Sequence, residues 1–242
     1  MTCNCQNDGG KGIETFKQKV EGIGKFTERL ENPEIDDLSF LLKDHLSFGN
    51  TKLPEKIAIF NLGSAKDCPN YRNSSCQAYD EDTDTDYCYA RKAEKQYPDA
   101  LEYRRRQQII WNRISASEFS RAFEQFYSRM HKDISFLRFN ESGDFRNQRD
   151  VHKAEQIAKY LKENLEIDTY TYTASDELDF TVCEYLTVNA SNPDINGYDQ
   201  RFTCVEDESD IPDDGFVCPQ DCSVCHACMS DGGTSDIYEL LH

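Results

Sequence analysis

Four of the eleven cysteines lie in one short run near the carboxyl end of the chain. The thiols in this run are separated by three, two and two residues, so one short turn of chain can present several sulfurs to a single centre. Four thiolates suit tetrahedral zinc or an iron-sulfur cluster, and repeated Cys-x-x-Cys steps are more usual of ferredoxin-like clusters. The sequence therefore predicts a fully ligated metal site, with an iron-sulfur cluster favoured over zinc, at Cys218, Cys222, Cys225 and Cys228.

A second group of cysteines, Cys68, Cys76 and Cys88, is spaced more widely, with seven and eleven residues between its members. Three protein ligands leave one coordination position of a metal open, which is typical of a catalytic site and not of a structural one. We therefore expect this group to be the reactive one. The alternative is that the three are unrelated buried or surface cysteines.

The start of the chain and the number of cysteines indicate the cellular compartment. The start of the chain, with Cys3 and Cys5, has neither the basic start nor the apolar run of a secretion signal, so we expect a cytoplasmic protein, in the host cytoplasm if the chain is viral. Thiols stay reduced there, and an odd number of cysteines is better explained by metal ligation than by disulfides. Cys183 and Cys204 stand in apolar contexts and are interpreted as packing residues. The roles of Cys3 and Cys5 stay open.

The net charge of -18 limits the classes of partner. It repels a phosphate backbone and therefore disfavours nonspecific nucleic-acid binding, although Arg104–Arg106 leaves a local basic site open. No apolar stretch approaches the roughly 20 residues that span a bilayer, so no membrane association is expected. The substrate or partner, small or macromolecular, is not identified by composition.

The elements that must position these cysteines follow from the apolar periodicity. Strands alternate with helices, which implies a mostly parallel sheet whose reactive loops lie at the carboxyl ends of its strands. Because about five strands are visible, we predict an α/β fold with a partial barrel or a short, mostly parallel sheet, flanking helices and a cysteine-rich C-terminal tail. Helices are expected from Ile13 to Leu30, from Tyr89 to His131 with a break at Pro98 and a restart at Ser115, from Asp150 to Leu165 and briefly after Asp176, and strands at 53–62, 134–140, 168–173 and 184–189.

Three segments are expected on this basis. Residues 1–52 form an N-terminal helical segment, residues 53–206 form the α/β core that carries the first cysteine group, and residues 207–242 form the metal-binding tail. Cys68, Ser142–Asp144 and Ser175–Asp176 are then expected together at the carboxyl edge of the sheet.

Several short motifs follow one another from about Leu53 to Cys228. They are Asn61-Leu62-Gly63, Cys68-Pro69, Cys76, Cys88-Tyr89-Ala90-Arg91-Lys92, Tyr97-Pro98, Ser142-Gly143-Asp144-Phe145, Tyr172-Thr173-Ala174-Ser175 and the terminal cysteines. This order of motifs resembles the phage gene product 88 family. The Cys-Tyr-Ala element at Cys88 is also similar to the cluster loop of radical S-adenosylmethionine enzymes, although the cysteines are more widely spaced here.

The resemblance implies a four-iron four-sulfur cluster on the first cysteine group, with one iron free to chelate S-adenosylmethionine. Tyr87 would pack near the adenine, and Ser142, Gly143 and Asp144 would form the motif that contacts the methionine ammonium. The first hypothesis is therefore an iron-sulfur enzyme resembling this class, with a second cluster in the tail. The second is a zinc-stabilised binding protein that contacts a protein or nucleic-acid partner without catalysis.

Overall fold

The computed structural model describes most of the chain after residue 23, and it divides the chain into two compact units, residues 1–34 and 35–242. Cys3, Cys5 and most of the helix expected from Ile13 lie outside the described residues, although residues 24–28 are helical. The described residues are 24–28, 30–31, 33–71, 76, 79–80, 85–130, 133–192, 194–230 and 236–240.

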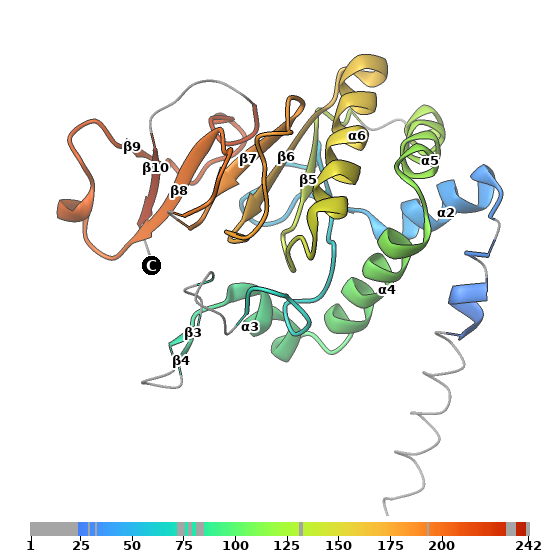
Figure 1. Cartoon of the computed structure of the whole chain (residues 1–242), viewed down its shortest axis with the longest axis horizontal. Coiled ribbons are helices and arrows are strands. Elements are labelled where there is room, and N and C mark those ends of the chain that lie inside the picture. Colours follow the sequence, from blue (N-terminus) through green and yellow to red (C-terminus); the bar gives the residue numbers. More distant parts are fainter. Residues whose placement is uncertain are drawn as a thin grey trace, which may run out of the picture. The chain divides into compact units, whose positions relative to one another are not determined.

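The second unit is built on an open eight-stranded sheet (Figure 1). Neighbouring strands are parallel except for β1 and β2, so the predicted α/β class with a mostly parallel sheet, flanking helices and a cysteine-rich tail is confirmed. In sheet order the strands are β1 (Ser47–Phe48), β2 (Ile57–Phe60), β5 (Phe136–Phe139), β6 (Asp168–Thr173), β7 (Leu186–Ala190), β8 (Gln200–Val205), β10 (Ile237–Leu240) and β9 (Phe216–Val217).

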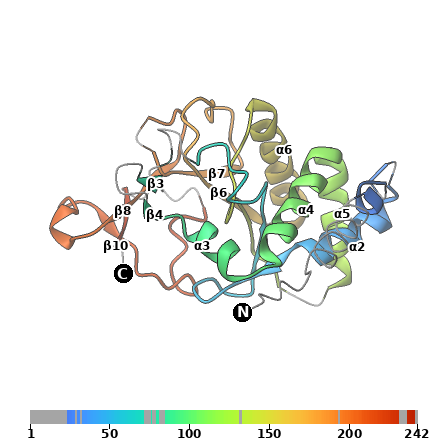
Figure 2. The ribbon, with the colours of Figure 1, turned by 90° about the horizontal axis from the view of Figure 1, so that it is seen from below.

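Helices cover one face of this sheet (Figures 1 and 2). Side chains alternate between the faces of a strand, and Phe60 and Phe139 point to this helical layer, where the ring of Trp111 lies 6.4 and 5.5 Å from their rings. The helices of this unit are α2 (Ile35–His45), α3 (Tyr89–Gln96), α4 (Ala100–Arg113), α5 (Ala116–Arg129), α6 (Gln148–Leu165) and the short η1 (Glu208–Asp210).

The predicted helix boundaries after the first cysteine group are confirmed. The chain breaks between α3 and α4 at Pro98, and α5 starts with a capping box in which Ser115 and Glu118 each satisfy the other's backbone amide. The hairpin of β3 (Tyr79–Asp80) and β4 (Thr85–Asp86) stands beside α3, between Cys76 and Cys88 (Figure 1). The insert between these cysteines therefore leads directly into the helix that follows Cys88.

The side chain of Lys153 in α6 caps the carboxyl end of α4. Its ammonium donates to the carbonyl of Trp111 and, at 2.5 Å, to that of Ile114, and it lies 4.2 Å from the centre of the Trp111 ring. Burial lowers the pKa of Lys153 from 10.5 to about 8, while Asp150 and Glu118 act in the opposite direction. The protonated side chain is thus less favourable in the folded than in the unfolded chain.

This shift predicts a pH dependence of stability. Between pH 8 and 10.5 the unfolded chain binds more protons at Lys153, so the free energy of unfolding rises with pH in this window. The penalty is complete below pH 8 and is gone above 10.5. Lys153→Met keeps the apolar stem and is expected to flatten this rise, which urea unfolding at several pH values between 8 and 10.5 measures. An unchanged slope in the variant would contradict the assignment.

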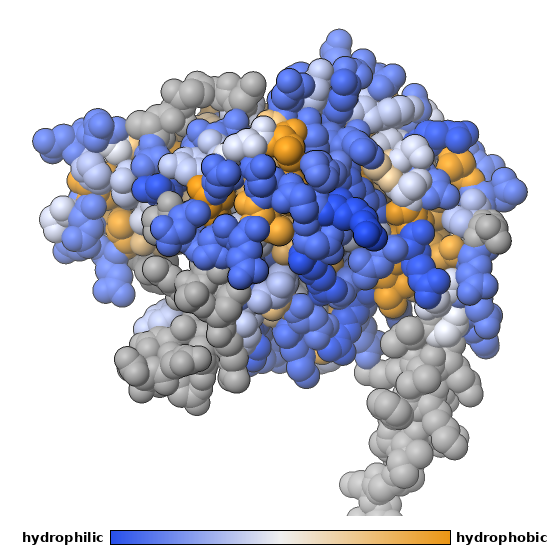
Figure 3. Space-filling model, in the orientation of Figure 1, coloured by the Kyte–Doolittle hydropathy of each residue, from blue (hydrophilic) through white to orange (hydrophobic). Residues whose placement is uncertain are grey.

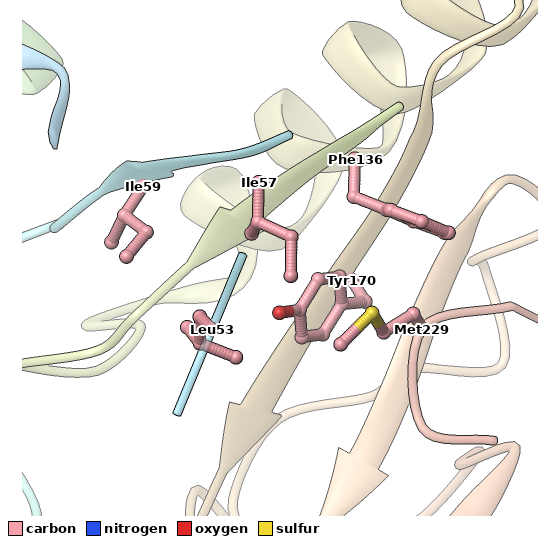
Figure 4. Packing of buried hydrophobic residues seen from close by; sticks show 6 residues of the cluster. All are labelled: Leu53, Ile57, Ile59, Phe136, Tyr170 and Met229. Carbon is pink, nitrogen blue, oxygen red and sulfur yellow. The ribbon is translucent and has the colours of Figure 1, made fainter. Parts of the chain in front are cut away.

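The opposite face of the sheet, called here the inner face, is covered by the carboxyl-terminal segment. Its cluster of buried residues includes Ile57 and Ile59 from β2, Phe136 from β5, Tyr170 from β6 and Met229 from the tail (Figure 4). Cys222 and Cys228 pack against this cluster. The tail therefore belongs to the core of the second unit.

Two expectations about the elements are wrong. The sheet has eight strands where about five were visible, because β1, β8, β9 and β10 are short or poorly alternating in sequence. No helix follows Asp176 among the described residues; turns lead to β7 instead.

None of the helices in the described part of the chain is long and apolar enough to cross a membrane. On the face in Figure 3, apolar side chains form separate patches among hydrophilic ones.

Candidate functional site

The loops after β2, β5 and β6 meet at the carboxyl edge of the sheet, because these neighbouring strands are parallel. The first two loops touch through their backbones. Gly143 has a φ of 76°, and a Cβ at this position would lie 2.8 Å from the carbonyl oxygen of Gly63, so only glycine fits there. The amide of Ser142 also donates to the side chain of Asn61 at 2.7 Å. The Ser142–Asp144 loop is thereby fixed against the chain that leads to Cys68.

Glu94 in α3 ties the loop before Cys68 to the helix that follows Cys88. Its carboxylate accepts hydrogen bonds from two consecutive backbone amides of that loop, at 2.7 and 3.1 Å. Arg104 donates to the same carboxylate at 3.0 Å, and the side chains of Arg104 and Glu94 are only 8% and 6% exposed. Because Cys88 is the N-cap of α3, one buried carboxylate sets the position of the Cys68 loop relative to Cys88.

The residues on either side of the first cysteine are anchored as well. Asp67 accepts two hydrogen bonds from Arg105, at 2.6 and 2.9 Å, and these hold the pKa of Asp67 below its usual value. Asn70 donates to Asp144 at 2.8 Å and to Ser175 at 2.7 Å. The short loop that carries Cys68 is therefore held from α3, from α4 and from the loops after β5 and β6.

Asp144 is the centre of the contacts between these loops, and it is only 6% exposed. It accepts hydrogen bonds from Asn70 and Thr173 and from the backbone amides of Phe145 and Ala174, all between 2.7 and 2.8 Å. Burial raises the pKa of Asp144, and the four donors act in the opposite direction. A carboxylate offers about four acceptor positions, so groups of the chain itself fill them. Contact between Asp144 and a cofactor ammonium stays a prediction.

The structure brings the first cysteine group into one neighbourhood. Burial raises the pKa of Cys68 to about 12, and the negative charges of Asp144, Cys76 and Cys88 add to this shift. Within the described residues, however, no three His, Cys, Asp or Glu side chains are arranged closely enough to hold a metal ion. The three thiols therefore influence one another electrostatically without forming a closed ligand set.

Two tyrosines flank Cys88 with exposed rings. Tyr87, the predicted adenine neighbour, is 55% exposed, and Tyr89 is 57% exposed. The hydroxyl of Tyr89 donates to the carbonyl of Glu141 at 2.5 Å, which links the start of α3 to the loop after β5. The Ser142 hydroxyl contacts Glu94 at 3.5 Å. Tyr87 and Ser142 thus lie at the same edge of the sheet as Cys88.

The tail cysteines lie on the inner face, where two strand residues hold their backbone. Asn189 of β7 donates to the carbonyl of Cys228 at 2.8 Å, and Gln200 of β8 donates to the carbonyl of Ala227 at 2.6 Å. At the start of the run, the amide of Cys218 donates to the carbonyl of Tyr238 in β10 at 2.7 Å. The run is thus fixed at both ends to the sheet.

The four tail thiols also share one electrostatic environment. Burial raises the pKa of Cys222 to about 11, with Cys228 and Cys218 and then Cys225 adding to the shift and Arg138 opposing it. The hydroxyl of Tyr172 on the inner face is hydrogen-bonded to the sulfur of Cys228. The predicted set of four is thus gathered, although it too lacks the closed geometry of a metal site in the described chain.

The nine cysteines in the described part of the chain are all thiols. Burial raises the pKa of Cys183 to about 12, and the groups that act on it are the carboxylates of Glu155, Asp199 and Asp179. Cys183 is therefore separate from both groups. Cys204 lies on β8 and interacts electrostatically with Cys218.

Sequence reasoning missed the residues that position the first group, above all Glu94, Asn70 and Arg105. A signal was present for Glu94, because it follows the buried Ala90 by one helical turn and so shares its face of α3. Two arginines of the basic run at 104–106 form ion pairs within the protein, Arg104 with Glu94 and Arg105 with Asp67.

The comparisons with known proteins give one match. The profile of the family described as gene product 88 matches residues 40–194, which include the first cysteine group and the loops around Asp144 but not the tail cysteines. No curated protein and no solved structure matches the chain. The matched region covers more than half of the 242 residues, so the chain belongs to the gene product 88 family.

Proposed function

We propose that this chain is an iron-sulfur protein that resembles radical S-adenosylmethionine enzymes, with a reactive cluster on Cys68, Cys76 and Cys88. The observation that carries the proposal is the gathering of these three thiols at the carboxyl edge of a parallel sheet. Parallel α/β folds build their reactive loops at this edge.

The chemistry of the donors suits such a group, although the thiols of the described chain do not stand in the closed arrangement of a bound metal. Three thiolates suit an iron-sulfur cube that keeps one iron open, and the loop of Cys68 is held by the side chains of Glu94, Asp67 and Asn70. When bound, such a cluster supplies one-electron chemistry and a coordination position for S-adenosylmethionine. The anchors of the loop orient the ligands, and the exposed ring of Tyr87 offers a flat surface for an adenine beside them.

The tail is proposed to hold a second, fully ligated cluster, with zinc as the alternative metal. Its four thiols come from one run whose backbone is pinned to β7, β8 and β10, so the ligands are kept over the inner face. A site saturated by protein thiolates contributes its binding energy to folding. The tail site is therefore expected to be structural.

Metal analysis after anaerobic purification tests the proposal. A brown protein with iron and acid-labile sulfide supports it, and Cys68→Ser is expected to lower the iron content while the matched control Cys183→Ser leaves it unchanged. A colourless protein with stoichiometric zinc and no iron would replace the enzyme reading with that of a zinc-stabilised binding protein.

The structural role of the tail gives a separate prediction. Cys222→Ala or Cys225→Ala is expected to remove the tail metal and to lower the melting temperature by roughly 10 °C or more, because the bound metal stabilises the folded chain only. Cys183→Ala is the control, since Cys183 lies apart from the four thiols. Full metal content and an unchanged melting temperature in both tail variants would show that the four thiols do not share a site.

A further inference from the structure

We infer that the inner face of the sheet carries a binding site for an anionic small molecule, a carboxylate or a phosphate, with Arg138 as its anchor. The inference deepens the proposed function and rests on it for one point only, namely that the bound anion is a substrate. The binding itself follows from side chains of the inner face.

Arg138 reaches this face from the carboxyl half of β5. Its guanidinium lies 4.8 Å from the centre of the Tyr172 ring, and its Nε is buried without a hydrogen-bond partner in the described chain. The groups that act on it electrostatically are the phenols of Tyr89, Tyr170 and Tyr172 and, after them, the carboxylate of Glu141. A buried N–H without an acceptor is costly, and the forked N–H groups of a guanidinium match the two oxygens of a carboxylate or phosphate.

Other polar atoms of the same face also lack partners. The hydroxyl of Tyr170 and the side-chain oxygen of Asn189 have none among the described residues, although both residues are 0% exposed. Tyr170 pairs with Arg138 in the sheet register, and Asn189 pairs with Tyr172, so these groups stand on three adjacent strands. Figure 4 shows the Tyr170 ring between Ile57 and Met229 with its hydroxyl on the side of Leu53. Buried polar groups are normally paired, which points to a ligand or to water on this face.

Arg138 acts on groups of both cysteine sets, which indicates that an anion bound to it is a substrate. Its charge acts on Tyr89, the residue after Cys88, and it also acts on Cys222 and Cys228 of the tail. A second cation stands over the same face, since the ammonium of Lys56 lies 5.7 Å from the centre of the Phe136 ring. An anion bound at Arg138 is therefore presented to the reactive edge of the sheet while the tail lies beside it.

The competing explanation is that Arg138 only balances the negative charge of the tail thiolates. The two readings differ in what Arg138→Met does. If Arg138 is an anion anchor, the variant loses anion binding, keeps its metal and is as stable as the wild type or more so, because a buried N–H without an acceptor is gone. If Arg138 is a counter-ion, the variant loses metal.

The test is isothermal titration calorimetry of the full chain with inorganic phosphate and with succinate, on protein as purified and after anaerobic reconstitution. We expect Arg138→Met to weaken binding of one of these probes about tenfold or more, in line with the loss of hydrogen bonds to a charged group. The matched control is Arg201→Met. Arg201 follows the inward-facing Gln200 in β8, so it points to the opposite face, where it contacts Tyr198.

Three results would overturn the inference: no binding of either probe by the wild type, equal weakening in both arginine variants, or loss of metal from Arg138→Met with anion binding intact. Arg138-dependent binding by a chain that holds no iron would uphold the site while the proposed function fails. Iron in the wild type without anion binding would overturn the anion site while the proposed function stands.

Discussion

Glu94→Ala is expected to lower the free energy of unfolding by about 3–5 kcal/mol, because it leaves the buried guanidinium of Arg104 without its partner. The same change removes the acceptor of two backbone amides in the loop before Cys68. Urea unfolding followed by circular dichroism measures the loss. We also expect the iron content of the folded variant to fall, since the loop that carries Cys68 loses its link to the helix that follows Cys88.

Two further variants make this prediction specific. Glu163→Ala removes the acid of the exposed pair with Lys159, at 3.8 Å, and is expected to cost less than about 1 kcal/mol. The double variant Glu94→Ala/Arg104→Met buries no unpaired charge and is expected to lose less stability than Glu94→Ala alone. If Glu94→Ala were as stable as Glu163→Ala, the buried pair would not hold the loop.

Asp144→Ala is expected to be at least as damaging, with a loss of about 3 kcal/mol or more, because each buried donor left without an acceptor costs about 1–3 kcal/mol. The donors are Asn70 in the loop after β2, Thr173 at the end of β6 with the amide of Ala174 after it, and the amide of Phe145 next to Asp144 itself. The measurement is again urea unfolding, together with proteolysis of the loop around Asn70, which is expected to become faster.

The control for this variant is Asp168→Ala. Asp168 forms a surface ion pair with Lys162 at 2.5 Å, with side chains 32% and 49% exposed, so its loss is expected to matter little. A binding experiment with S-adenosylmethionine separates the two roles of Asp144. Weaker binding by a variant of unchanged stability would assign the carboxylate to the cofactor and would contradict its role in joining the loops.

The parts of the fold that were predictable are those with strong local patterns. The strand around Leu137, the helix from about Asp150 and the capping box at Ser115 each carry their own periodicity or cap, and all are confirmed. Strands β8, β9 and β10 carry no such signal. Their pairing joins residues as far apart as Phe202 and Ile237, which short-range patterns do not report.

The thiols of the candidate site could be picked out from the sequence, whereas the side chains that support them could not. Cysteine spacing identified two thiol groups, and both are gathered in the fold. The side chains that hold the Cys68 loop contact it across 28 to 105 residues of sequence, as with Glu94 and Lys66 or with Asn70 and Ser175. Such contacts arise only once the parallel strands bring their carboxyl ends together. Arg138 was missed for a related reason, because its isolation on the inner face depends on the neighbouring strands.

Mössbauer spectroscopy of the iron-reconstituted full chain, recorded with and without S-adenosylmethionine, tests the central claim most directly. We expect one iron site to change on addition of S-adenosylmethionine while the others do not. This response is expected to disappear in Cys68→Ser/Cys88→Ser and to persist in Cys222→Ala/Cys225→Ala. A chain that retains no iron, or iron sites that all stay unchanged when S-adenosylmethionine is added, would contradict a reactive cluster on Cys68, Cys76 and Cys88.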